Sequence, residues 1–200
     1  MKLLIGSPRC GSTNISMYFN EYNKKHMNCK VHDGFAEYLL DAPHSDQIPL
    51  DIKVQYIEDC RKNGHELLYK IHAFHLFQND WLYEWFFDFY KDAEIYVLKR
   101  RNLWKAYTSL LAHNAIGRKL WHNDGTKQNE LLELLSSIDI THDTNVMKNF
   151  LQQQQYLNSI SGTELFMEDL NHEKINLMLG LNITEEFYKP WNIDYEQYIH

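Results

Sequence analysis

A glycine-bracketed turn near the start of the chain constrains its fold more than any other feature of the sequence. Residues 6–13 read Gly-Ser-Pro-Arg-Cys-Gly-Ser-Thr; they follow an apolar run at residues 3–5 and precede apolar residues at helical spacing between positions 15 and 22. A strand, a tight turn and a helix start direct backbone N–H groups and a helix N-terminus toward a bound anion. The sequence therefore predicts a phosphate-binding loop at the end of the first strand.

This loop lacks the lysine of the nucleotide triphosphatases. Gly6 and Gly11 have the G-x-x-x-x-G spacing, but Ser12 and Thr13 stand where Lys and Ser or Thr would follow. The positive charge lies inside the loop, at Arg9. We expect such a loop to hold phosphate but to reach the outer phosphates of ATP poorly; a tight turn without a ligand is the alternative interpretation.

Composition and charge predict one globular domain over residues 1–200. The length and a hydrophobic content of 44% are enough for a substantial core. A net charge of -7 argues against general nucleic-acid binding, so an anionic ligand needs a local basic cluster. Three cysteines give no disulfide framework and indicate a reducing compartment. With no signal core or membrane-length apolar run, we expect a soluble, cytoplasmic protein that contacts neither nucleic acid nor membrane.

Strand candidates alternate with helix candidates along the chain, which predicts the α/β class with three layers, α/β/α, around a central parallel sheet. We interpret the four-glutamine run at residues 152–155 as a solvated helix face. Strands are predicted at residues 3–5, 67–71, 95–98 and 163–167, and helices at residues 51–63, 81–90, 127–137, 143–159, 175–179 and from Asn102 onward, the last with Leu103, Ala106, Tyr107 and Leu110 on one face.

A second basic segment follows the third predicted strand. The strand ends in Lys99-Arg100-Arg101, and Asn102 and Ser109 lie seven residues apart, so they share one face of the following helix. A guanidinium and a hydroxyl placed in this way can converge on one phosphate dianion. A solvated basic strand end is the alternative interpretation.

Three segments resemble the sulfotransferases. Residues 8–13 match the family's 5'-phosphosulfate loop, Pro-Lys/Arg-Ser-Gly-Thr/Ser-Thr, except at Cys10. Residues 96–109 resemble the motif that binds the 3'-phosphate of the donor, in which a Ser follows a strand-end Arg by eight residues, as Ser109 follows Arg101. Residues 165–170, Leu-Phe-Met-Glu-Asp-Leu, look like the family's Tyr-Glu-Asp-Leu element. The resemblance spans residues 4–170 in family order and implies the P-loop-like sulfotransferase fold.

The resemblance also implies a donor, 3'-phosphoadenosine 5'-phosphosulfate (PAPS). Arg9 would neutralise charge on the bridging oxygen, and Arg101 with Ser109 would hold the 3'-phosphate; a shift of one residue would give Arg100 this role. Asn14 stands where relatives often place a Trp against the adenine, so the adenine contact stays open. The donor-binding residues implied in this way are Arg9, Cys10, Gly11, Ser12, Thr13, Asn14, Arg101 and Ser109.

A strand-end histidine is the candidate catalytic base. Residues 69–74, Tyr-Lys-Ile-His-Ala-Phe, resemble the Lys-Thr-His element of the soluble phenol and alcohol sulfotransferases. This implies His72 as the base that takes the acceptor proton and Lys70 as the neighbouring catalytic lysine. A different strand register would make His75 the base.

Other sulfotransferases use a glutamate instead of a histidine. Residues 33–38 look loosely like that region, so Glu37 or Asp33 is an alternative base. The H-x-x-H spacing of His72 and His75 also suggests metal binding, but on a strand the two side chains would point to opposite faces, and no cysteine pair completes a zinc site. We expect no metal.

The expected function is transfer of a sulfuryl group from PAPS to a hydroxyl of a small, phenolic or alcohol acceptor, by a monomer or a homodimer. Three alternatives stay open. They are a carbohydrate sulfotransferase with a Glu base, a small-molecule kinase on a degenerate phosphate loop, and a nucleotide-binding protein without catalysis.

Overall fold

The computed structural model describes residues 2–12, 15, 55, 59, 62, 68–77, 88, 91–116, 128–180, 182 and 193–200. Its elements are, in chain order, β1 (Lys2–Gly6), β2 (Leu68–His72), α4 (Ala73–Phe77), β3 (Glu94–Lys99), α6 (Leu103–Ile116), α7 (Gln128–Ser137), α8 (Thr144–Ser159), β4 (Thr163–Phe166), the 3-10 helix η4 (Met167–Asp169), α9 (His172–Leu179) and the 3-10 helix η5 (Tyr195–Tyr198).

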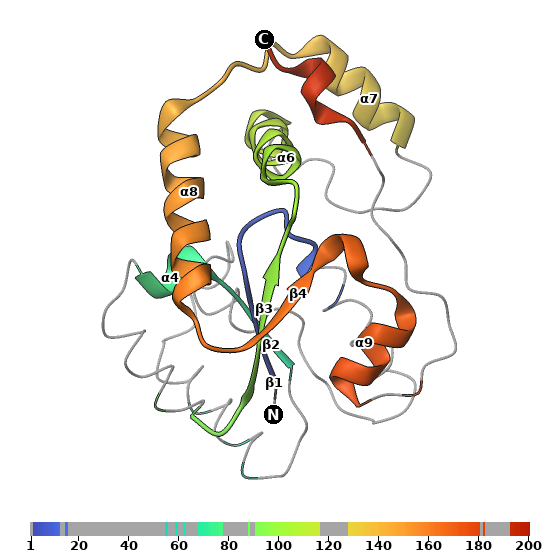
Figure 1. Ribbon diagram of the computed structural model, residues 1–200. Helices are drawn as coiled ribbons and strands as arrows, with labels where there is room; N and C mark the ends of the chain where they lie inside the picture. The colour runs from blue at the N-terminus through green and yellow to red at the C-terminus, as the bar shows by residue number, and fades with distance from the viewer. Residues whose placement is uncertain are drawn as a thin grey trace.

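A four-stranded parallel sheet forms the centre of the described part (Figure 1). The strand order is β2-β1-β3-β4, and every neighbouring pair is parallel. Gly6 is paired in register with His72 on one side and with Leu98 on the other, so the carboxyl ends of three strands lie level. The chain leaves β1 toward β2 and later returns to the other side of β1. Ligands of open parallel sheets bind at such a change of direction, at the carboxyl ends of the strands.

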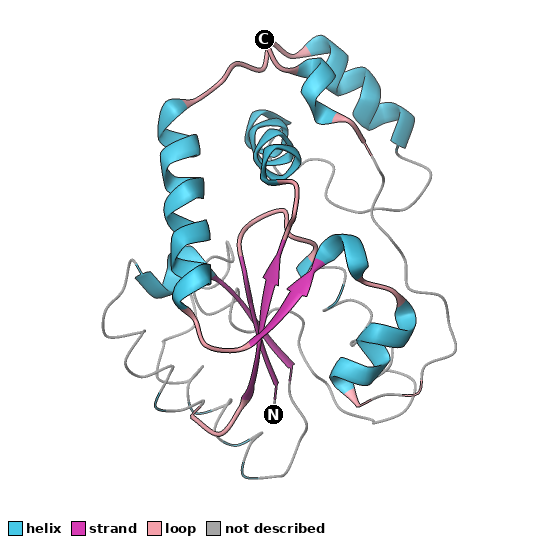
Figure 2. Ribbon diagram, in the orientation of Figure 1, coloured by secondary structure: helices cyan, strands magenta, loops and turns pink. Residues whose placement is uncertain are grey.

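Helices cover both faces of the sheet (Figures 1 and 2). Leu4 and Leu98 pack in one buried cluster with Ile175 and Met178 of α9. Leu3, Ile5 and Val97 alternate with them, are fully buried and point to the opposite face, where α4 and α8 lie in Figure 1. Strands buried on both faces are typical of parallel sheets. The predicted α/β class with a parallel sheet is confirmed, and this layering is compatible with three layers.

Most predicted elements lie where the sequence places them. All four strands are confirmed within one residue at each end. Helix α8 begins at Thr144 because the Asp143 carboxylate caps it, accepting hydrogen bonds from the N–H groups of Asn145 and Val146 at 2.8 and 3.1 Å. Helix α9 begins earlier than predicted because Asn171 caps it by accepting from Lys174 N at 2.9 Å. The helices predicted at residues 51–63 and 81–90 lie almost wholly outside the described residues.

Helix α6 lies beyond the carboxyl ends of the strands (Figure 1). It packs with residues of α7 and α8 in a second hydrophobic cluster, distinct from the one that joins the sheet to α9. Tyr107 is buried there beside Phe150 of α8, and its hydroxyl donates to the Asp143 carbonyl at 3.2 Å. Leu103, predicted on the buried face, is 39% exposed, because the first turn of α6 projects beyond this core and burial begins at Ala106. None of the helices in the described ranges has the length and apolar character needed to span a bilayer.

The interpretation of residues 152–155 as a solvated face is wrong for two of the four glutamines. Gln153 and Gln154 are only 6% and 9% exposed. They share the inner face of α8 with Phe150 and Leu157, at the i, i+3, i+4, i+7 spacing of a buried helical stripe. Gln154 Nε2 donates to Ser7 Oγ at 2.9 Å, so α8 reaches the loop that follows β1.

The Gln154–Ser7 hydrogen bond predicts a stability difference between neighbouring glutamines. Gln154→Met keeps the side-chain volume but leaves the buried Ser7 hydroxyl without this donor, which should lower the free energy of unfolding by about 1–3 kcal/mol. Gln155→Met, at an exposed position of the same helix, should change it by less than about 0.5 kcal/mol. Urea denaturation of both variants measures the difference. Equal losses in the two variants would contradict the structural role of the bond.

Candidate anion-binding site

The loop after β1 has an unusual backbone. Cys10 N donates to the Ser7 carbonyl at 3.3 Å, which closes a turn before the helical residue Ser12. Arg9 has φ 65° and Gly11 φ 88°, both in the left-handed region. This conformation is uncommon for a residue with a side chain and is concentrated at functional sites. The fold therefore holds Arg9 in a strained conformation that fixes where its side chain begins.

Gly11 is required for packing as well as for its φ angle. A Cβ atom at this position would lie 2.2 Å from the sulfur of Met167, in η4. Met167 is buried in the same cluster as Cys10, whose side chain points into the core. The third segment that resembles sulfotransferases, residues 165–170, therefore packs directly on the loop after β1.

A hydrogen bond joins the loop to the second predicted segment. Arg9 Nε donates to Ser109 Oγ at 3.0 Å, across 100 residues of sequence. Ser109 is 4% exposed in the middle of α6, so its hydroxyl is held rigidly. The structure thus brings the two segments predicted to bind phosphate into one site.

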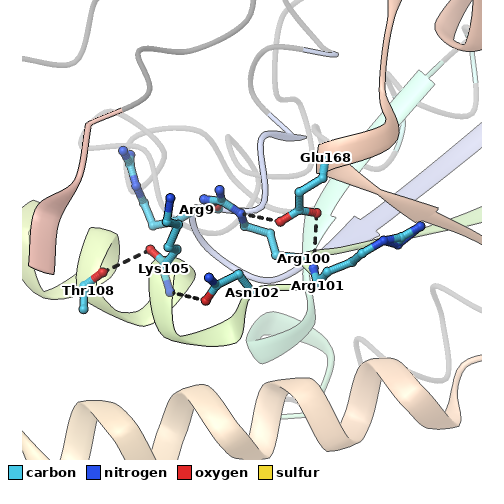
Figure 3. Close-up of polar contacts among 7 residues, drawn as sticks. All are labelled: Arg9, Arg100, Arg101, Asn102, Lys105, Thr108 and Glu168. Carbon is cyan, nitrogen blue, oxygen red and sulfur yellow. Dashed lines mark hydrogen bonds and ion pairs between the residues drawn. The ribbon is translucent and has the colours of Figure 1, made fainter.

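Glu168 ties the third segment to both of the others (Figure 3). Its carboxylate accepts from Arg100 Nε at 3.4 Å and from Arg101 N at 3.2 Å. Arg100 Nη1 in turn donates to the Arg9 carbonyl at 3.5 Å. Partial burial acts to raise the pKa of Glu168, but the hydrogen bonds from backbone N–H groups and the charge of Arg100 outweigh it, so this pKa lies below its usual value of 4.5. An ionised carboxylate therefore braces the strained turn through Arg100.

The side chain of Arg101 contacts two residues of the third segment. Its Nη2 donates to the Asp169 carboxylate, and its guanidinium lies 4.2 Å from the centre of the Phe166 ring. In Figure 3 its side chain extends away from Arg9. Among the described residues no hydrogen bond joins Arg101 to Ser109 or to Arg9. The role of Arg101 in phosphate binding stays a prediction.

His72 ends β2, as the sequence predicts, and is the register partner of Gly6. It is partly exposed, and its ring stacks on that of Phe74 at 5.8 Å. His72 therefore lies beside Gly6, where the loop after β1 begins. Lys70 belongs to β2 and His75 to α4. Thr13, Asn14, Asp33 and Glu37, and the side chains of Lys70 and His75, lie outside the described part of the chain.

Asn102 has a structural role that the sequence reasoning missed. The sequence pattern assigns it only to the helix face shared with Ser109. The structure makes it the cap of α6: its Oδ1 accepts from Lys105 N at 2.9 Å, and its carbonyl accepts from Ala106 N at 3.2 Å. An Asn directly before an apolar helical pattern is the signal that could have identified it.

The cations at this edge of the sheet divide into two groups. In the first group each cation is paired with a carboxylate: Lys99 with Glu164, Arg100 with Glu168, and Arg101 with Asp169. The second group is Arg9 and Lys105, for which the described residues supply no ion pair. An anion entering the site would meet these two charges without having to displace a carboxylate from them.

The fold and the site define an α/β protein with an arginine-containing, phosphate-type loop at the carboxyl edge of a parallel sheet. No protein-family model matches the chain, and no curated protein matches it significantly. The resemblance to sulfotransferases therefore depends on the short segments quoted above, residues 8–13, 69–74, 96–109 and 165–170.

The lowered pKa of Glu168 predicts how a variant responds to pH. An acid whose pKa is lower in the folded state stabilises the fold above its unfolded pKa, and this contribution is lost as the pH falls through the folded value. Glu168→Gln should therefore be less stable than the unmodified protein at pH 7, and the difference should shrink as the pH falls below about 4.3. Urea denaturation between pH 3 and 7 tests this, with Glu133→Gln, at an exposed position of α7, as the control. A stability difference that stays constant over this range would contradict the role of the ionised carboxylate.

Proposed function

We propose that this protein is a PAPS-dependent sulfotransferase with the P-loop-like sulfotransferase fold. The observation that carries the proposal is the hydrogen bond between Arg9 and Ser109. It joins the loop that resembles a 5'-phosphosulfate site to the helix that resembles a 3'-phosphate site. A nucleotide with phosphates at both ends of one ribose requires two anion sites this close together.

The loop supplies the groups that the 5' end of the donor needs. Backbone N–H groups of residues 10–13 and the hydroxyls of Ser12 and Thr13 would bind the phosphosulfate at the start of the first helix. Arg9 has no paired carboxylate among the described residues, so its charge is available to the oxygen that leaves sulfur. A guanidinium stays charged at every accessible pH, so its role is electrostatic and not that of a proton donor.

In the proposed reaction the acceptor hydroxyl oxygen attacks the sulfur atom. A new S–O bond to the acceptor forms as the S–O bond to the donor phosphate breaks, which gives a sulfate ester and adenosine 3',5'-bisphosphate. His72 takes the hydroxyl proton, and its place level with Gly6 supports this role. Arg9 stabilises the negative charge that develops on the phosphate oxygen.

The proposed acceptor is a small phenol or alcohol, because the strand-end histidine resembles the base of enzymes with such acceptors. The proposed location is the cytoplasm, which suits a cysteine inside the donor loop.

Nucleotide binding tests the donor assignment. Adenosine 3',5'-bisphosphate should bind more tightly than AMP by roughly 1.5–3 kcal/mol, since only the bisphosphate reaches both anion sites. At 100 times its Kd it should stabilise the fold by about 2.7 kcal/mol, measured as a rise in Tm. ADP with Mg²⁺ is the comparison. A larger rise with ADP and Mg²⁺ would overturn the donor assignment in favour of a kinase.

Replacement of the candidate bases tests the mechanism. His72→Ala should slow sulfuryl transfer from PAPS to a small phenol by about 10²–10⁴-fold and leave the affinity for adenosine 3',5'-bisphosphate nearly unchanged, as expected for a positioned general base. Glu37→Gln should change the rate little. The opposite result, a large loss with Glu37→Gln and a small one with His72→Ala, would assign the base to Glu37 and make a sugar hydroxyl the leading acceptor.

A further inference from the structure

Helix α6 presents a lysine beside the anion-binding site. Lys105 precedes Ser109 by one helical turn, so the two residues lie on the same face. Long helical side chains lean toward the N-terminus of their helix, here toward the carboxyl end of β3. In Figure 3 the Lys105 side chain points from α6 toward the loop that carries Arg9. Lys105 therefore faces the loop, whereas Arg101 points away from it.

The described residues place no carboxylate in an ion pair with Lys105 or Arg9. Two cations directed at the same site repel each other unless an anion lies near them. Two carboxylates described at this edge are engaged elsewhere, Glu168 with Arg100 and Asp169 with Arg101. Within the described residues neither Lys105 nor Arg9 has an ion-pair partner. A dianion between them would relieve the repulsion.

The Ser109 hydroxyl is suited to such a dianion. A helical serine usually donates to the carbonyl four residues earlier, which here is that of Lys105. That carbonyl already accepts the Thr108 hydroxyl at 3.3 Å. The Ser109 oxygen accepts from Arg9 Nε, and the described residues show no hydrogen bond donated by its hydroxyl. Its proton is therefore available to a ligand oxygen, from a side chain that is 4% exposed.

We propose that Lys105 is the cation that binds the 3'-phosphate of the donor, together with Ser109 and Arg9. This inference rests on the proposed donor nucleotide and departs from the role that the resemblance gives Arg101. Arg101 instead holds η4 through Asp169 and Phe166. The Lys105 ammonium makes contact only with a nucleotide that carries the 3'-phosphate, so it sets specificity for the bisphosphate over a 5'-monophosphate.

Calorimetric titration of the full chain with adenosine 3',5'-bisphosphate and with AMP tests the assignment. Lys105→Gln should weaken binding of the bisphosphate about 10- to 100-fold, the range of a charge-assisted hydrogen bond, and change AMP binding less than about twofold. Lys105→Arg should restore most of the preference. Arg101→Gln should keep it, and Lys148→Gln, at an exposed position of α8, should match the unmodified chain.

The possible outcomes separate the two proposals. If the unmodified chain prefers the bisphosphate and Lys105→Gln keeps that preference, the role of Lys105 is overturned and the donor assignment stands. If the preference for the bisphosphate over AMP disappeared in Arg101→Gln and not in Lys105→Gln, Arg101 and not Lys105 would bind the 3'-phosphate. If Lys105→Gln weakened the binding of both nucleotides equally, Lys105 would act only through its general electrostatic attraction, and the inference would be overturned. Equal affinity of the unmodified chain for both nucleotides would overturn the donor assignment itself.

Discussion

The site depends on one ionised carboxylate, that of Glu168. Arg9, Arg100 and Arg101 come together at one sheet edge, and their mutual repulsion would oppose this unless an anion compensated it. Glu168 accepts from Arg100 and from the Arg101 N–H, which fixes the connection between β3 and α6. Arg100 is then placed to donate to the Arg9 carbonyl, which supports a backbone conformation that arginine rarely adopts.

The paired and unpaired cations have different consequences. The carboxylate partner of a paired arginine offsets its charge, so the main role of the arginine is to hold segments in place. Arg100 holds the loop after β1, and Arg101 holds η4. Arg9 has no ion-pair partner among the described residues, and its hydrogen bond to the buried Ser109 fixes the direction of its guanidinium. Preorganised charge of this kind stabilises developing negative charge without the cost of reorientation. The site therefore separates the residues that build it from the residues that are available to a ligand.

Local signals predicted most of the fold and part of the site. Apolar, β-branched runs located the strands, and glycine spacing located the loop with Arg9. The features that the sequence did not predict depend on contacts between segments far apart in the chain. Gln154 is polar by type, and only the proximity of Ser7, 147 residues away, makes it a buried residue. The choice between Arg100 and Arg101 likewise depends on Glu168 and Asp169, which follow a strand about 67 residues later. No local pattern around residue 100 contains that information.

The chemistry of the loop also explains how an anion site can exist in a chain that matches no family model. At a phosphate loop most of the hydrogen bonds to the anion come from backbone N–H groups, and any residue except proline supplies one. Cys10 illustrates this: its side chain is buried with Leu4 and Met167, and a Cβ at Gly6 would lie 2.5 Å from its sulfur. The Cys10 thiol therefore faces the core and not the outer side of the loop. The constraints with a physical origin at this loop are the glycine at position 11, the cation at position 9 and the Ser109 hydroxyl of α6 that accepts from it.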